Sequence, residues 1–391
     1  MSVAASMLAA WSGEEASMVG KAISSSVIRL IVVSVASGAF VASCADGNTT
    51  GANALSSHAR AGRNAYEVER LVSDDTTIVP AEHQDSALVN AWGLAASSTG
   101  PWWVANNGTS TSTLYDGEGN KQALQVTVPG DPTGLVFHGG SGLLVNGFAS
   151  RFIFATEDGT LEAWAPQLQP NTASVTVVPN AGDASYKALA IATVNGSDRL
   201  YATNFHQGRV DVFGSTWQPV SLGADAFHDG DLPAGYAPFG IRAIASMVIV
   251  TYAKQDAEAG DEIDGPGLGF VDAYDLNGGF LFRIGSRARL NAPWGIAMAP
   301  DDFGAFGGAL LIGNFGDGHI NAFDLTQCHR NGCHDRGELH GSSGGAIAID
   351  GLWAIDFGKG NTNTGDTDAL YFTSGPNKEK HGLFGYIEPS N

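Results

Sequence analysis

One phrase recurs six times along this chain, and it limits the fold more than any other feature of the sequence. Each copy opens with a short apolar strand that begins near a glycine. The copies begin WGLAAS at Trp92, TGLVFH at Thr133, KALAIA at Lys187, FGIRAI at Phe239, WGIAMA at Trp294 and LWAIDF at Leu352. Successive copies start 41 to 58 residues apart, and internal repeats of about this length indicate solenoids or propellers.

The sequence inside each repeat is typical of β-strands. A second strand, a polar turn and a third strand follow each opening, as in LLIGNFGDGHINAF after Trp294. Apolar and polar residues alternate with a period of two, and Gly, Asn and Asp bound the runs. Gly accounts for 52 of the 391 residues, which suits a fold with many tight turns. No stretch has a convincing amphipathic-helix pattern.

Six such units predict an all-β fold, a six-bladed β-propeller. A pair of β-sandwiches is the rival, but it gives no reason for six copies of one phrase. The sixth unit ends after its third strand, and an orphan strand, residues 66–72, precedes the first unit. We expect this strand to pair with the sixth unit and close the ring, which removes exposed sheet edges. In the second unit, the segments at Leu143 and Phe152 compete for the second strand.

The N-terminal residues predict export. Residues 1–44 contain an apolar run that ends in VASC, which resembles a bacterial lipoprotein box with Cys44 as the lipidated residue. Ordinary secretion and an uncleaved anchor are the alternatives, although the run is short for a membrane-spanning helix. Residues 45–65 predict a flexible tether, and residues 66–391 the propeller. The expected location is therefore the periplasm or the cell surface, with membrane attachment through Cys44.

Charge and motifs exclude several functions. The formal net charge is −20 and no basic run occurs, so nucleic-acid binding is not expected. The sequence GSSGG at Gly341 fits a nucleophile-elbow pattern, but it lies in a polar loop with no helix after it. No phosphate-binding loop, dinucleotide-binding fingerprint or zinc-protease motif is present.

The repeat WGIAMAP…LLIGNFGDGHINAFD resembles an NHL-type repeat. More closely, PWWVANNGTSTSTLYDG, RFIFATEDGTLEAW and FGAFGGALLIGNFGDGHINAFD resemble a family of uncharacterised bacterial exported β-propeller proteins. The resemblance covers nearly all of residues 66–391 and implies the fold and export, but no activity. A more distant similarity links the repeats to gluconolactonase-like propellers, which hold a metal with Glu, Asn and Asp from different blades.

If the NHL comparison holds, the loops between second and third strands lie together on one face around the channel, here called the loop face. By resemblance, four side chains on it are candidate Ca²⁺ ligands: Glu157, Asn204, Asn314 and Asn106. Oxygen ligands suit this ion. Other polar residues of these loops are Lys254, Asp256, Asp317 and Asn377. The alternative is that Asn and Asp before Gly are ordinary residues of tight turns.

His206, in TNFHQGR, is the candidate general base, since a histidine at the channel mouth can activate water near neutral pH. The alternative is a loop histidine packed beside Phe205. Residues 254–267, here called the acidic loop, form the longest insertion between second and third strands. This loop is a candidate cation site or lid, or else a solvated acidic loop.

Cys328 and Cys333 enclose the sequence HRNG, in which Asn-Gly is a hairpin-turn signal. With Cys44 lipidated and the protein exported, two thiols remain, and we expect them to form a disulfide. Haem attachment with His334 and zinc binding with nearby histidines are the alternatives. The resembled family lacks this cysteine pair.

Two functions follow from these observations. The first is a non-catalytic module that binds a small ligand or a protein partner on the loop face. The second is a metal-dependent hydrolase of the lactonase type, in which a channel Ca²⁺ polarises a carbonyl and His206 activates water. We expect the first, because no catalytic constellation stands out from turn chemistry, and the sequence leaves open whether the chain is an enzyme.

Overall fold

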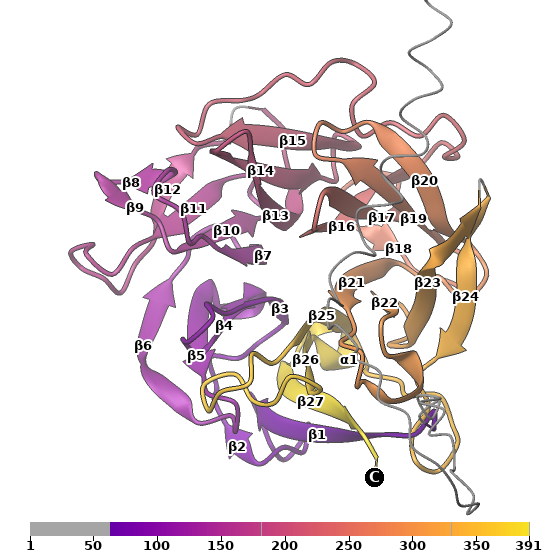
Figure 1. Ribbon diagram of the computed structural model, residues 1–391. Coiled ribbons are helices and arrows are strands. Elements are labelled where there is room, and N and C mark those ends of the chain that lie inside the picture. The colour runs from indigo at the N-terminus through magenta and orange to yellow at the C-terminus, as the bar shows by residue number, and fades with distance from the viewer. Residues whose placement is uncertain (1–62, 181, 330, 391) are drawn as a thin grey trace, which may run out of the picture. The chain divides into compact units, whose positions relative to one another are not determined.

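The computed structural model describes residues 63–390, apart from residues 181 and 330. The predicted signal peptide, Cys44 and most of the predicted tether lie outside the described residues. Six β-sheets stand around a central axis (Figure 1), which confirms the predicted all-β, six-bladed β-propeller. Within residues 63–390, no helix has both the length and the hydropathy needed to cross a membrane.

Each repeat opening forms the innermost strand of a blade. These strands are β3 (Ala91–Ala95), β7 (Pro132–Phe137), β13 (Tyr186–Val194), β16 (Tyr236–Ile244), β21 (Pro293–Met298) and β25 (Leu352–Phe357). Each inner strand contacts the next around the ring, and β25 contacts β3 again. All six predicted starts therefore lie in the strands that line the central channel.

Glycine in the repeat opening lets neighbouring inner strands approach closely. A Cβ atom on Gly93 would lie 2.4 Å from the carbonyl oxygen of Thr133 in the next blade. One on Gly240 would lie 2.1 Å from the carbonyl oxygen of Trp294. A side chain has no room at such distances, so ring packing requires glycine at Gly93 and Gly240, whereas the third and sixth blades have Ala188 and Ala354 at the equivalent position.

The remaining strands follow outward in each blade. Second strands are β4 (Trp102–Asn106), β10 (Phe152–Thr156), β14 (Ser197–Asn204), β17 (Met247–Gln255), β22 (Leu310–Asn314) and β26 (Leu370–Ser374). Third strands are β5 (Thr111–Tyr115), β11 (Leu161–Trp164), β15 (Arg209–Gly214), β19 (Gly269–Asp275), β23 (Ile320–His329) and β27 (Leu383–Pro389). Fourth strands are β6 (Lys121–Thr127), β12 (Val175–Val178), β20 (Phe280–Ser286), β24 (Gly332–Glu338) and β1 (Tyr66–Ser73).

The ring is closed by β1, as the sequence predicts. This strand runs antiparallel to β27, with Tyr66 opposite Pro389 and Ser73 opposite Leu383. The short strand β2 (His83–Gln84) extends the same sheet. In the second blade, the segment at Phe152 forms the second strand, whereas β8 (Leu144–Val145) and β9 (Phe148–Ala149) form a separate hairpin.

The core lies between the blades, where aromatic side chains of neighbouring sheets pack together. Between the first two blades, the Trp103 ring lies 4.0 Å from Phe152 and 4.7 Å from Trp164, centroid to centroid. Because each blade buries its faces against its neighbours, the ring depends on closure for its stability.

Cys328 and Cys333 lie opposite each other in the β23–β24 hairpin and form a disulfide. Both sulfur atoms are bonded to each other, so neither cysteine can attach haem or bind zinc in this structure. The bond links two neighbouring strands at the edge of the fifth blade, away from the channel-lining strands.

Candidate functional site

Two of the predicted Ca²⁺ ligands are held by their own turns. Asn204 accepts a hydrogen bond from the Gln207 backbone N–H at 3.2 Å and donates to Asp211 Oδ2 at 2.8 Å. Asn314 donates to Asp317 Oδ1 at 3.0 Å. These bonds match the alternative interpretation, in which the residues serve tight turns.

The other two predicted ligands have different partners again. Asn106 donates to Thr111 Oγ1 at 3.1 Å. The two carboxylate oxygens of Glu157 accept hydrogen bonds from Lys187 at 2.5 Å and Asn107 at 2.9 Å. Within the described part of the chain, no group of three or more His, Cys, Asp or Glu side chains is arranged to hold a metal ion. The four predicted ligands therefore share no hydrogen-bond partner, and the carboxylate of Glu157 pairs with the ammonium group of Lys187.

The remaining predicted loop residues are also bound locally. His206 is exposed, and its Nδ1 lies 3.2 Å from the carbonyl oxygen of Ala259 in the acidic loop. Asp256 accepts a backbone hydrogen bond inside that loop, and Lys254 lies on β17 opposite β18 (Glu262–Ile263). The backbone N–H of Asn377 donates to a carboxylate of a neighbouring turn. The carbonyl at Nδ1 leaves Nε2 of His206 as the basic nitrogen, but among the described residues no predicted Ca²⁺ ligand contacts this histidine.

Lys187 is the residue that joins the loop face together, and the sequence did not single out its role. Only 1% of its side chain is exposed. Its Nζ donates to Glu157 Oε1 at 2.5 Å and to Asp261 Oδ1 at 3.2 Å, and it lies 5.3 Å from the centroid of the Trp92 ring. One buried cation therefore contacts the second blade, the acidic loop and an aromatic ring of the first blade.

Two further carboxylates complete what we call the Lys187 cluster: Lys187, Glu157, Asp261, Glu262 and Glu379. Burial raises the pKa of Glu262 to about 7 although Lys187 opposes the rise, and neighbouring carboxylates add to it. Burial also raises the pKa of Glu379, which accepts a hydrogen bond from Asn90 Nδ2 at 2.9 Å. Glu379 ends a turn, α1 (Pro376–Glu379), whose last three residues have φ between 56° and 63°. Three consecutive left-handed residues are costly, so their surroundings must impose this turn.

Tryptophan rings fill the channel beneath this cluster. The ring of Trp353 lies 3.9 Å from Trp92, 5.8 Å from Trp294 and 4.1 Å from Phe315, centroid to centroid. Asn90 Oδ1 accepts hydrogen bonds from the indole N–H groups of Trp92 and Trp353, both at 3.0 Å. Aromatic rings and paired charges thus occupy the loop-face end, where the predicted hydrolase would need an accessible metal.

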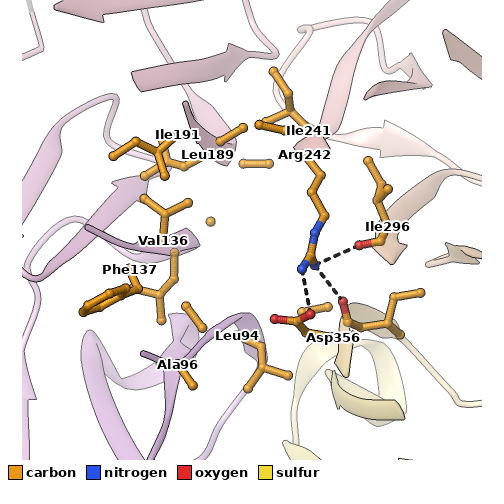
Figure 2. Close-up of a pocket in the computed structure, with 18 of the residues that line it drawn as sticks. Leu94, Ala96, Val136, Phe137, Leu189, Ile191, Ile241, Arg242, Ile296 and Asp356 are labelled. Carbon is orange, nitrogen blue, oxygen red and sulfur yellow. Dashed lines mark hydrogen bonds and ion pairs between the residues drawn. The ribbon is translucent and has the colours of Figure 1, made fainter. Parts of the chain in front are cut away.

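The opposite end of the channel holds a cavity of about 300 Å³ (Figure 2). Its wall comes from the later residues of the inner strands, which follow the tryptophan layer, and Trp294 also lines it. Most lining side chains are aliphatic, including Leu94, Val136, Leu189, Ile191, Ile241 and Ile296. The cavity therefore combines aliphatic side chains with nearly as much polar surface, at the channel end away from the predicted ligand loops.

One cluster of charged side chains interrupts the aliphatic part of this wall. Arg242 lies 2.6 Å from Asp356 Oδ1 and donates to the carbonyl oxygens of Ile296 and Ile355 at 3.0 and 3.3 Å, as Figure 2 shows. Lys359 Nζ lies 3.1 Å from the other oxygen of Asp356. Burial opposes ionisation of Asp356, but the two cations hold its pKa below the ordinary value. Two cations face one carboxylate, so the charged side chains lining the cavity carry one net positive charge.

Alignment of the six repeats shows how the sequence could have pointed to Arg242, Asp356 and Lys187. When the sixth copy is aligned on Trp353 instead of Leu352, Arg242 and Asp356 both occupy the fourth position of the shared phrase, where the other blades have Ala95, Val136, Ala190 and Ala297. Lys187 occupies the first position, where five blades have Trp92, Thr133, Phe239, Trp294 and Trp353. Charged residues at repeat positions that are uncharged elsewhere are the feature that could have identified both ends of the channel.

Sequence comparison finds relatives in a virus, Acanthamoeba polyphaga mimivirus. The chain is 33% identical to uncharacterized protein R648 of Acanthamoeba polyphaga mimivirus over 82% of this chain and 80% of that protein. It is 30% identical to uncharacterized protein L690 of the same virus, over 82% and 85%. No known family profile matches the chain. Bacterial membership, export and NHL-type repeats stay predictions.

Solved structures with a similar fold are distant in sequence. A streptogramin B lyase aligns with a TM-score of 0.44 and 13% identity, over 83% of this chain and 97% of that one. A gluconolactonase from Xanthomonas campestris aligns with a TM-score of 0.44 and 14% identity, over 77% and 89%. At this similarity, neither says anything about the activity of this chain.

Proposed function

The chain belongs to the family of the mimivirus proteins R648 and L690, and we propose that it is a binding protein for a small amphipathic anion. The ligand would enter the cavity at the Arg242 end of the channel. This proposal keeps the predicted non-catalytic binding function but moves the site away from the loop face. The observation that carries it is the cavity lined largely by aliphatic side chains, with one cluster of charged residues, Arg242, Asp356 and Lys359, on its wall.

The apolar wall supplies the binding energy. Burying each methylene group of a ligand contributes about 0.8 kcal/mol, before the cost of immobilising the ligand is subtracted. At about 300 Å³, the cavity is at the lower end of the range for ligand pockets, so it suits a short chain or a single ring.

The charged group supplies orientation and selects the sign of the ligand charge. Arg242 is held by two backbone carbonyls and one carboxylate, so its guanidinium is fixed in place. About a third of the Arg242 side chain (34%) is exposed, and Lys359 Nζ has one carboxylate partner for its three donors. A carboxylate or sulfonate can therefore bind beside the pair, whereas a cation would meet one excess positive charge.

The hydrolase has no comparable support. Its proposed ligands Glu157, Asn204 and Asn314 have separate hydrogen-bond partners, although the buried Oδ1 of Asn314 has none, and among the described residues none of the three contacts His206. The open cavity contains no histidine, cysteine or serine among its described lining residues. The geometry therefore favours binding over hydrolysis.

Isothermal titration calorimetry with octanoate tests the proposal. We expect a dissociation constant between about 10 μM and 1 mM, because a short alkyl chain and one ion contact provide only a few kcal/mol of net affinity. Octylamine and 1-octanol share the chain but lack the negative charge, and they should bind at least about tenfold more weakly.

Three variants assign any binding to the cavity. Arg242→Met removes the anion contact and Ala96→Phe fills the cavity wall, so each should weaken octanoate binding about tenfold or more. Arg289→Met is the matched control, since Arg289 also pairs with an aspartate at 2.6 Å but lies outside the cavity. Equal affinity in all four proteins, or octylamine binding as tightly as octanoate, would reject the proposal.

We also propose export as a lipoprotein, which rests on the sequence of residues 1–44. Such export would place the binding site outside the cytoplasm. Processing at Cys44 that is sensitive to globomycin tests it, and cleavage at another residue contradicts it.

A further inference from the structure

The third blade differs from the other five in its outer edge. Each of the others has a fourth strand, and the sixth blade receives its fourth strand, β1, from a distant part of the chain. Within the described residues the third blade ends at its third strand, β15, which is the outermost strand of that sheet (Figure 1). Unpaired sheet edges are binding sites for other strands unless they are covered.

The chain covers only one half of this edge. After β15 it turns back, so that Val220 N–H donates to the Val212 carbonyl at 2.8 Å and Gly214 N–H donates to the Gln218 carbonyl at 2.9 Å. The backbone N–H and C=O of every second residue point to the same edge of a strand. Val210 therefore directs both groups away from β14, to the edge at which Val212 and Gly214 bind the returning chain. Among the described residues, no partner binds Val210 N–H, Val210 C=O or Val212 N–H on that side.

A groove lies beside the uncovered half of the edge. Its volume is about 660 Å³, more than twice that of the channel cavity. Its apolar lining comes from β15, from the segment after it and from the end of the second blade: Val210, Val212, Val220, Leu222 and Pro179. Backbone donors and acceptors thus stand next to an apolar groove, which is the combination that an added strand requires.

We propose that an extended segment of a different polypeptide docks here as the missing fourth strand of the third blade. Its backbone would continue the ladder at Val210 and Val212, and alternate side chains would enter the groove. The sixth blade shows that this position in the ring accepts a strand that does not follow directly in sequence. This site is independent of the proposed channel site.

Charge indicates which segment fits. In the groove, Arg209 is neutralised by Asp211 at 2.6 Å. Asp183 and Asp225 are exposed and adjoin residues that line the groove. The formal net charge of the whole chain is −20, which disfavours association with a second copy. The occupant is therefore a strand with apolar residues at alternate positions and lysine or arginine between them.

A synthetic octapeptide that alternates valine with lysine is the probe. Val210→Pro removes the outward N–H without breaking the β14–β15 ladder, and proline is tolerated at such edge positions. Val210→Thr is the matched control, because it keeps the N–H and the β-branched shape. The proline variant should bind the peptide about tenfold more weakly, whereas the threonine variant should stay within about twofold of the wild type.

Peptide chemistry and hydrogen exchange complete the experiment. A probe with N-methylated valines cannot form the ladder, and one with glutamate in place of lysine has the wrong charge; both should lose binding. Amide exchange of the segment Arg209–Gly214 in the wild-type chain should slow on addition of the lysine probe. This measurement decides the question even if Val210→Pro does not fold.

Four results would overturn the proposal. The first is unchanged peptide affinity in a folded Val210→Pro variant, and the second is binding of the N-methylated probe with equal strength. The third is protection of Arg209–Gly214 that rises with the concentration of the chain alone, which would identify a second copy as the occupant. The fourth is full protection in the free chain at every concentration, which would mean that the chain covers its own edge.

Discussion

The ammonium group of Lys187 is surrounded by the carboxylates of the Lys187 cluster and is almost completely buried. Its direct partners are Glu157, which follows β10, and Asp261 in the acidic loop. These residues belong to the second and fourth blades, while Lys187 itself lies in the third. Coulombic attraction in a poorly solvated site therefore ties three blades together at the loop face.

Replacing Lys187 by methionine should destabilise the fold. The change removes the only cation of the cluster and leaves Glu157 without its ion pair, so the free energy of unfolding should fall by about 1–3 kcal/mol. Arg209→Met is the control, since it breaks an exposed pair and should cost less than about 1 kcal/mol. Urea unfolding measures both, and equal stability of the two variants would contradict a structural role for Lys187.

The pH dependence of stability should report on Glu262. Its pKa is about 7 in the folded chain and 4.5 as the ordinary value. The folded state holds the proton more tightly, so this contribution to stability is complete below pH 4.5 and is lost as the pH rises through 7.

Glu262→Gln removes that contribution. The stability of the variant relative to the wild type should therefore increase between pH 4.5 and 7.5. Asp272 has a pKa that burial raises to about 7 as well, but its contribution is common to both proteins and cancels in the difference. A difference that stays constant over this pH range, measured by thermal unfolding, would show that Glu262 titrates normally.

The sequence predicted the fold, but it did not predict which side chains would pair with one another. Arg242 and Asp356 are 114 residues apart, and they pair because ring geometry brings the fourth and sixth blades together across the channel. A strand pattern has no information about which blades face one another. The polar turns were more visible in the sequence, because Asn and Asp next to Gly stand out, and they proved to be bound largely within their own loops.

At the scale of elements, strand β1 decides whether the ring closes. Tyr66 on this strand is 1% exposed, and its ring lies 4.8 Å from Phe303 and 6.2 Å from Phe306, centroid to centroid. These contacts join β1 to the fifth blade as well as to β27. Closure thus depends on side-chain burial in addition to the backbone ladder.

Tyr66→Ala should lower the free energy of unfolding by about 3–5 kcal/mol, since it removes a large buried aromatic side chain. Glu67→Ala on the same strand is exposed and should change stability by less than about 0.5 kcal/mol. Chemical denaturation compares the two. A small effect of Tyr66→Ala would mean that β1 contributes little to closure.

The disulfide should contribute less to the free energy of unfolding than Tyr66 does. Cys328 and Cys333 are separated by 5 positions, and closing so short a loop stabilises a fold by only about 2 kcal/mol. The double serine variant should therefore stay folded and bind octanoate like the wild type. Loss of octanoate binding in this variant would mean that the β23–β24 hairpin influences the cavity.

The order of the strands could largely be predicted from the sequence, because each blade repeats the same alternation of apolar and polar residues. The orphan strand, residues 66–72, could complete the sixth unit, which lacks a fourth strand of its own. The missing fourth strand of the third blade was not readable. Residues 215–235 contain turn residues of the usual kind, and only the pairing of Val220 with Val212 shows how far they cover the edge.

At the scale of the whole propeller, the two ends of the channel have opposite character. The loop-face end is filled by Trp92, Trp353 and the Lys187 cluster, whereas the other end is an aliphatic cavity with Arg242 on its wall. The sequence indicated the loop face because that is where polar residues gather. An apolar cavity gives little sequence signal, since its lining looks like ordinary core.

The most direct test of this account is a crystal structure with 8-bromooctanoate, whose bromine is located by anomalous scattering. We predict bromine among Leu94, Val136 and Ile191, with the carboxylate next to Arg242 and an unchanged tryptophan layer below. Bromine at the loop face, or a cavity that stays empty at saturating ligand, would contradict the claim that the open end of the channel is the binding site.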